Sequence, residues 1–294
     1  MFARLLVALG LMLFLCCSAA TATQNLNSAT GYVLVPDASV APNDSVQVSG
    51  AYLATEGKSE LSKLQLSAPC HGRGFNLRAI TGIGEKAEAG IGWLSVTKDP
   101  GTASAFGLAG KIQFYHNPDT KMALAAGLLY RSWTTNMTIH TSVDDFDADL
   151  PNVTTLYLVL DKEWESFSEM DWKWTGTVGL AYDSFSSSRQ KSATWPFYED
   201  PDLPISADGT IESKTFLTPF LGVKTSNGDW TFLADLKLQE KNKKFIYSDT
   251  AWSLAARKSF AESWTATAGL TTFNIPYAKS DVGWFVDVSY QFAK

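Results

Sequence analysis

The stretch WTFLADLKL, residues 230–238, decides the fold, because its even positions are all apolar while Thr231, Asp235 and Lys237 stand among the odd ones. Segments 248–258, 263–273 and 281–292 repeat the pattern. Successive side chains of a β-strand point to opposite sides, so this alternation predicts strands with one apolar and one polar face. An aromatic residue stands at one or both ends of each apolar stripe.

Two architectures accommodate such strands. A soluble sandwich buries the apolar face against a second sheet, whereas a transmembrane barrel turns it to lipid and places aromatic residues at the level of the headgroups. Aromatic residues make up 13% of the chain, with 10 Trp, and their placement favours the barrel. The expected interfacial girdle consists of Trp93, Trp164, Trp172, Trp230, Trp252, Trp264, Trp284, Tyr290 and Phe292.

The N-terminus has the composition of a secretory signal. Arg4 precedes an apolar run from Leu5 to Cys17, and small residues follow it, so residues 1–22 are predicted to be a signal peptide cleaved near residues 20–22. Two of the 3 Cys lie in this segment, which leaves Cys70 alone and excludes an internal disulfide after cleavage. A formal charge of -6 argues against nucleic acid as a partner.

The rest of the chain is expected to form one domain, a periplasmic lead-in over residues 23–44 followed by an outer-membrane barrel over residues 45–294. About twelve segments have the length of a tilted membrane strand. They are residues 45–54, 73–81, 86–96, 104–115, 121–133, 153–165, 172–185, 213–225, 229–240, 248–258, 263–273 and 281–292. The fold class is therefore all-β, a transmembrane antiparallel up-and-down β-barrel.

The connections support this prediction, because short and long ones alternate along the chain. Short turns are expected at residues 82–85, 116–120, 166–171, 226–228 and 259–262, and longer or irregular connections at 55–72, 97–103, 134–152, 186–212, 241–247 and 274–280. Bacterial barrels have short periplasmic turns and longer external loops. An even number of strands returns both ends of the chain to the same side.

Polar positions opposite the apolar stripes are expected to face the lumen. They carry charges of both signs, which are costly on the lipid face. The predicted lumen-lining residues are Lys111, Gln113, Asp161, Glu163, Lys173, Asp183, Asp235, Lys237, Arg257 and Asp287. Small barrels are filled by side chains and large ones conduct, so about twelve strands leave both an open pore and a filled lumen as alternatives.

Neither an enzyme nor a cofactor is predicted. The three His residues are scattered, and the sequence has no nucleophile elbow or phosphate loop. Asp145, Asp147 and Asp149 have the oxygen-rich spacing of a Ca²⁺ loop. They lack the glycine and the terminal Glu of a helix-loop-helix calcium site, so no metal site is assigned to them.

Two segments resemble bacterial outer-membrane β-barrel families and, more loosely, the YjbH-like group tied to exopolysaccharide export. Residues 29–38, ATGYVLVPDA, are similar to the Thr-Gly-x-x-x-x-Pro-x-Ala lead-in of that group, and residues 76–93 are similar to the strand and glycine-rich turn that such barrels repeat. The ending Tyr290-Gln291-Phe292 resembles the aromatic signal read by the barrel-assembly machinery, although Ala293 and Lys294 follow it.

These observations predict a barrel in the outer membrane that acts as a passive pore or export channel for polar solutes. The resemblance implies a link to polysaccharide. The expected partners are outer-membrane lipid, the barrel-assembly machinery and a polar solute or polysaccharide. The alternatives are a structural or binding barrel with a filled lumen, and a secreted soluble β-sandwich that binds a ligand.

Overall fold

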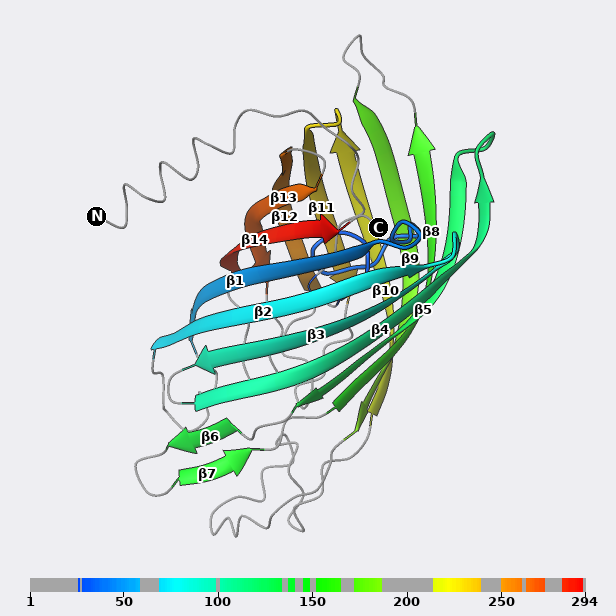
Figure 1. Cartoon of the computed structure of the whole chain (residues 1–294). Coiled ribbons are helices and arrows are strands. Elements are labelled where there is room, and N and C mark those ends of the chain that lie inside the picture. Colours follow the sequence, from blue (N-terminus) through cyan, green and yellow to red (C-terminus); the bar gives the residue numbers. More distant parts are fainter. Residues whose placement is uncertain are drawn as a thin grey trace, which may run out of the picture.

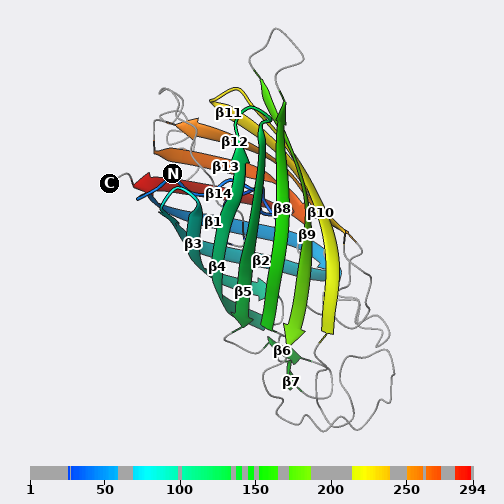
Figure 2. The ribbon, with the colours of Figure 1, turned by 90° about the vertical axis from the view of Figure 1, so that its right-hand side faces the viewer.

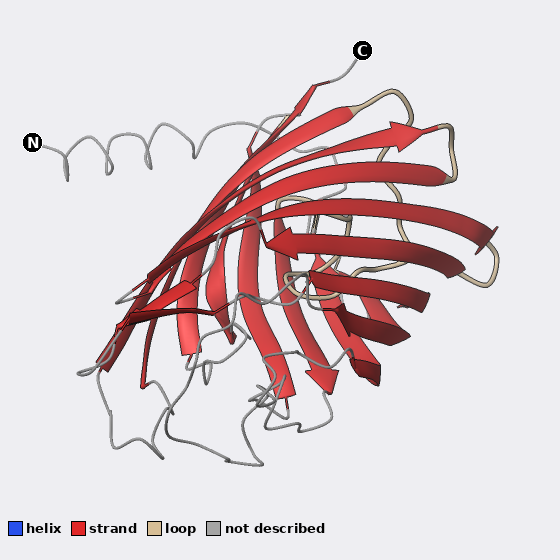
Figure 3. Cartoon of the chain, turned by 90° about the horizontal axis from the view of Figure 1, so that it is seen from below, coloured by secondary structure: helices blue, strands red, loops and turns tan. Residues whose placement is uncertain are grey.

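The chain folds into a closed antiparallel barrel of 12 strands, seen from three sides in Figures 1, 2 and 3. The computed structural model describes residues 26, 28–58, 69–98, 101–133, 137–140, 145–148, 152–164, 172–186, 214–238, 250–260, 263–272 and 282–292. The barrel strands are β1 (Val46–Lys58), β2 (Pro69–Ile83), β3 (Ala87–Lys98), β4 (Gly101–Asn117), β5 (Met122–Trp133), β8 (Asn152–Trp164), β9 (Lys173–Ser186), β10 (Lys214–Ser226), β11 (Trp230–Leu238), β12 (Thr250–Phe260), β13 (Trp264–Thr272) and β14 (Val282–Phe292).

Each barrel strand pairs with its neighbours in the chain, and β1 pairs with β14 to close the wall. A further two-stranded sheet, β6 (Met137–His140) with β7 (Asp145–Ala148), lies beyond one end of the wall (Figures 1 and 2). The predicted barrel of about twelve strands is thus confirmed. The alternative of a soluble sandwich is wrong, because the strands form one closed sheet instead of two stacked ones.

The wall has an apolar outer surface and a mainly polar inner one. On β14, Val282, Trp284, Val286 and Val288 are exposed while Phe285, Asp287 and Ser289 between them are buried. Pairing of every wall strand on both edges satisfies the backbone without water, which is the condition for crossing a bilayer with strands. The exposed stripe is the surface that such a barrel offers to lipid.

The rule that even positions face outward holds for β14 but reverses in three strands. Phe75 on β2, Trp93 on β3 and Leu221 on β10 are exposed at odd positions. The reason is the register across the connections. Phe185 of β9 pairs with Lys214 of β10. Paired residues point to the same side of the sheet, so the outward-facing positions, which are even in β9, are odd in β10. The connection to β11 pairs Ser226 with Thr231 and restores the original parity.

The two ends of the barrel differ. One end, called here the short-turn end, carries the tight turns after β2, β4 and β10 together with the start of β1 and the end of β14. The opposite end, the long-loop end, carries the long connections. Among the described residues there is no helix with the length and apolarity needed to cross a membrane.

Candidate functional site: the plugged lumen

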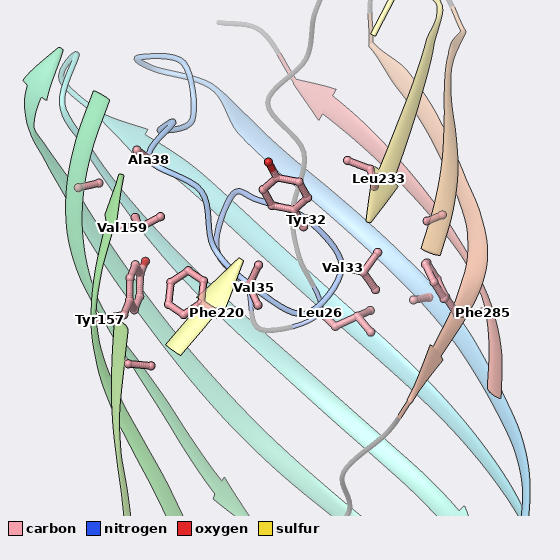
Figure 4. Packing of buried hydrophobic residues seen from close by; sticks show 14 of the residues in the cluster. Leu26, Tyr32, Val33, Val35, Ala38, Tyr157, Val159, Phe220, Leu233 and Phe285 are labelled. Atoms are coloured by element: carbon pink, nitrogen blue, oxygen red, sulfur yellow. The ribbon is translucent and has the colours of Figure 1, made fainter. Parts of the chain in front are cut away.

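The lumen is occupied by the chain's own N-terminal segment. Its described residues, Leu26 and Ser28–Ala41, are called here the plug. Tyr32, Val33, Val35 and Ala38 are almost completely buried and form one hydrophobic cluster with Phe220, Tyr157 and other inward residues of the wall. Figure 4 shows these side chains surrounded by strands from opposite sides of the barrel. The plug therefore lies inside the barrel, across the path that a solute would take.

A tight reversal at Gly31 gives the plug its compact shape. Gly31 forms an antiparallel bridge with Pro36, and the Tyr32 amide donates to the Val35 carbonyl over 3.0 Å. The φ angle of Gly31 is 152°, and a Cβ there would stand 2.5 Å from the Val35 carbonyl oxygen. Only glycine fits such a close approach of backbone to backbone. The glycine of the Thr-Gly motif is thus required by the turn itself.

Three carboxylates of the wall bind the backbone of the plug. Glu88 of β3 accepts hydrogen bonds from the amides of Thr30 (2.9 Å) and Ala41 (2.8 Å). Asp235 of β11 accepts from the amides of Val33 (2.8 Å) and Leu34 (3.2 Å), and Asp161 of β8 accepts from the amide of Ala38 (3.0 Å). Charged acceptors make strong hydrogen bonds, and here they satisfy amides that have no strand to pair with. The wall therefore binds the plug through hydrogen bonds from its carboxylates to the plug backbone.

Lysines of the wall hold the plug through Asp37. The Lys224 ammonium stands 2.8 Å from the Asp37 carboxylate and the Lys111 ammonium 3.7 Å from it, and Lys111 also lies 3.2 Å from Glu88. Burial alone would raise the pKa of Asp37, but Lys224 and Lys111 outweigh it and hold this pKa below its usual value. Asp37 therefore stays ionised, and the buried charges neutralise one another.

Tyr32 is the anchor of the plug. Its side chain is fully buried, and its hydroxyl lies 2.8 Å from the Thr177 hydroxyl of β9. The ring rests on Gly222 of β10, where a Cβ would come within 2.7 Å of a ring carbon. Glycine at this point of the wall leaves the space that the ring fills.

The plug sits nearer the short-turn end than the long-loop end. Glu88 is the second residue of β3, directly after a tight turn, and Lys224 is the third residue from the end of β10. On the other side of the plug, toward the long loops, Arg131 and Trp133 stand at the end of β5 and line a cavity of about 160 Å³. The plug thus lies toward the short-turn end, with this cavity on its long-loop side.

The predicted lumen residues fall into three groups. Lys111, Gln113, Asp161 and Asp235 contact the plug, with the Gln113 amide donating to the Ala38 carbonyl over 2.7 Å. Inward residues of the wall pair among themselves, namely Asp183 with Lys237 (2.8 Å), Asp287 with Arg78, and Arg257 with Thr267 (3.2 Å). Glu163 and Lys173 differ from the prediction, since they are exposed near the strand ends at the short-turn end, where the wall no longer encloses them.

The plug was not predicted from the sequence. Residues 23–44 were expected to be a periplasmic lead-in ahead of the barrel, whereas the described part of that segment packs within it. Three inward charges that serve the lumen, Arg78, Glu88 and Lys224, were also missed. All three have even numbers and lie on the strands with reversed parity. They were missed because the rule that even positions face outward fails on these strands.

Most of the predicted girdle residues stand near one end or the other of their strands, on the outward-facing positions. Trp164, Trp264, Tyr290 and Phe292 stand near the short-turn end, and Trp264 and Tyr290 pack with ring centres 4.7 Å apart. Toward the long-loop end lie Trp252 and Trp284, and Trp93 is exposed on β3 between. Trp172 and Trp230 each stack on Phe232, at 5.7 and 6.4 Å. The assignment of these residues to lipid headgroups stays a prediction.

The acidic loop considered for Ca²⁺ is only partly described. Asp145 and Asp147 lie in β7, opposite His140 and Thr138 of β6, and Asp149 lies outside the described residues. Within the described ranges no group of three or more His, Cys, Asp or Glu side chains is arranged to hold a metal ion.

Comparison with known proteins identifies the fold. No protein-family model and no curated sequence matches the chain. Among solved structures, it is similar to the COG4313 outer membrane channel from Pseudomonas putida F1 (12% identity, TM-score 0.53, 88% of this chain and 100% of that one) and to the translocator domain of the autotransporter NalP from Neisseria meningitidis (13%, 0.51, 84% and 89%). The NanC porin is comparable (11%, 0.50, 83% and 98%). The chain thus has the fold of outer-membrane barrels.

Proposed function

We propose that this chain resides in the outer membrane of a bacterium and works as a passive channel for polar solutes, with the plug closing its lumen at rest. The observation that carries the proposal is how the plug is held. Wall carboxylates bind its backbone amides, and water can replace such hydrogen bonds when the segment leaves. The charged and polar inner wall would then be left as the lining of a path. The similar structures include proteins titled as a channel and a porin.

Conductance across a planar bilayer tests the proposal. The chain from residue 23 onward is expected to open rarely, and a variant lacking residues 23–41 is expected to conduct steadily, because the deletion removes the segment that packs between inward side chains of the wall. Migration of unboiled protein on a gel shows whether each variant has formed a barrel.

A second variant keeps the chain length. Glu88→Gln, Asp161→Asn and Asp235→Asn together weaken all three carboxylate attachments and are expected to raise the open fraction at least tenfold. Lys162→Gln is the matched control, because the Lys162 ammonium donates to the Thr120 carbonyl in the turn between β4 and β5. If neither opened variant conducts while both form barrels, the chain is a binding barrel with a filled lumen and the channel proposal is wrong.

A link to polysaccharide is the second candidate, and it rests on the resemblance to the YjbH-like group. Residues 29–38, which carry that resemblance, lie within the plug. Export of a polymer would require the plug to leave the lumen entirely. The truncated variant therefore tests this candidate also, by passage of an oligosaccharide in a vesicle-swelling assay. Engagement of lipid and of the barrel-assembly machinery through the C-terminal aromatic residues belongs to the same proposal.

A further inference from the structure

The outer surface carries a cation on β2 at the edge of its apolar stripe. From Arg73 to Ile83 the odd positions of this strand face outward, and only Arg73 among them is charged. These two residues are separated by about 33 Å along the strand, which is about 25 Å along the barrel axis because membrane strands tilt by about 35–45°. The apolar band of such barrels is about 25 Å tall. With Ile83 at one edge of the band, Arg73 stands at the other, where lipid headgroups begin.

The surroundings of Arg73 on this face are uncharged. Arg73 pairs with Ala54 of β1 and with Thr97 of β3, and paired residues of adjacent strands point to the same side of the sheet. Its side chain is exposed, and no carboxylate among the described side chains forms an ion pair with it. The positive charge is therefore available to an anionic group outside the barrel.

An apolar hollow adjoins Arg73 on the outer surface. Its volume is about 500 Å³, and its lining includes Tyr52 and Ala54 of β1, Val282 and Trp284 of β14, and Arg73 itself. Ala54 pairs with Trp284 on one side and with Arg73 on the other, so a methyl group stands between two large side chains. The rings of Tyr52 and Trp284 have their centres 5.5 Å apart. Since a cavity of about 150 Å³ holds benzene, this hollow has room for a stretch of acyl chain.

We propose that this part of the outer surface binds a lipid with an anionic phosphate headgroup, the phosphate at Arg73 and one acyl chain in the hollow at Ala54. The proposal rests on the proposed function, because only a barrel that resides in a membrane turns this face to lipid. A guanidinium makes bidentate, charge-assisted hydrogen bonds to phosphate, and Tyr and Trp suit the boundary between apolar and wet surroundings. The long loops of bacterial barrels are external, so the lipid belongs to the external leaflet.

Native mass spectrometry of the detergent-solubilised chain from residue 23 onward tests the site. The probes are phosphatidic acid, which is anionic, and phosphatidylcholine with the same acyl chains, in which choline balances the phosphate charge. Phosphatidic acid is expected to bind at least tenfold more tightly, because only its phosphate leaves a net negative charge for Arg73. Equal affinity for the two lipids would overturn the proposal.

Titration calorimetry with inorganic phosphate separates a lipid from a free ion. Inorganic phosphate has the charge but no chain for the hollow, so it is expected to bind at least tenfold more weakly than phosphatidic acid. Equal affinity would show that the surface takes free phosphate and that the lipid proposal is wrong.

Two variants locate the site. Arg73→Gln removes the cation and is expected to lower the affinity for phosphatidic acid to that for phosphatidylcholine. Ala54→Trp fills the hollow and should weaken the binding of phosphatidic acid several-fold. Migration of unboiled protein on a gel shows whether each variant has formed a barrel.

Lys258→Gln is the matched control. Lys258 is also a cation on the outward face, but it lies on β12 near the short-turn end, with its ammonium 4.9 Å from the centre of the Trp230 ring. Its replacement is expected to leave the preference for phosphatidic acid unchanged. A preference that survives both Arg73→Gln and Ala54→Trp, or that disappears in Lys258→Gln, would show that the lipid binds elsewhere and would overturn the proposal.

The two proposals fail separately. A preference for phosphatidic acid in a barrel that never conducts, even without its plug, would refute the channel and retain the lipid site. Steady conductance of the truncated variant, with equal affinity of the intact chain for both lipids, would refute the lipid site and retain the channel.

Discussion

At the residue scale, Tyr32 and Gly222 form a close contact between the plug and the wall. The ring fills a space that exists only because β10 has no side chain at this point, and the Tyr32 hydroxyl reaches across to Thr177 of β9. Lys224 lies 5.7 Å from the centre of the same ring, so the cation that binds Asp37 also stabilises the aromatic anchor. A single methyl group on the wall would disturb all of these contacts.

Gly222→Ala is therefore expected to displace Tyr32 and to raise the open fraction of the channel several-fold, with a loss of about 1–3 kcal/mol in the stability of the closed state. Bilayer recordings and urea unfolding in lipid vesicles provide the two measurements. Gly110→Ala is the matched control, because a Cβ at Gly110 of β4 meets no atom within 4 Å. Equal effects of the two substitutions would mean that strand glycines matter here only through the backbone.

At the scale of the element, each strand could be predicted from its alternation, but the side that faced the lumen could not be predicted from number alone. The apolar stripe of β14 was evident because its valines and aromatic residues stand at every second place. The reversal in β10 depends on how β9 and β10 are aligned across the connection between them. This alignment decides whether odd or even positions of β10 face outward. At β4 a bulge between Gln113 and Tyr115 leaves both Phe114 and Tyr115 exposed. Neither feature has a signature in the strand's own residues.

The outward face of β5 gives a prediction at this scale. Leu128 is exposed in the middle of the strand, and Leu128→Arg is expected to destabilise the barrel in lipid by about 2–4 kcal/mol, because the charge would face the centre of the bilayer. Met122→Arg, on the same face at the short-turn end, should cost about 0–1 kcal/mol. Urea unfolding in vesicles compares the two, and equal losses would show that this face does not span a bilayer.

At the scale of the whole molecule, strand pairing all round the wall leaves no open sheet edge. The barrel is therefore expected to remain folded in detergent until heated, so that boiled and unboiled samples from the outer-membrane fraction migrate differently on a gel. Identical migration, with the protein found in the soluble fraction, would contradict a membrane barrel.

At the same scale, the contents of the lumen could not be predicted from the sequence. Lys111, Asp161 and Asp235 were predicted to face inward, but nothing in their strands indicates that they would bind the plug. The plug has no periodicity, because it pairs with itself and with side chains from strands scattered along the chain. Its motif, Thr30 to Asp37, resembles a known lead-in and predicts a turn. The place of that turn inside the barrel is seen only in the closed wall.

The pairing of β1 with β14 also constrains the order in which the plug and the wall can fold. The plug leads directly into β1, so it is synthesised before any strand. The hydrogen-bond acceptor of Val33, however, is Asp235, which lies 202 residues further along the chain. The segment can reach its final contacts only after β11 exists, and β14 then seals the cylinder around it. During folding, therefore, either the wall closes around the N-terminal segment, or the segment inserts into the barrel through one end after the wall has closed.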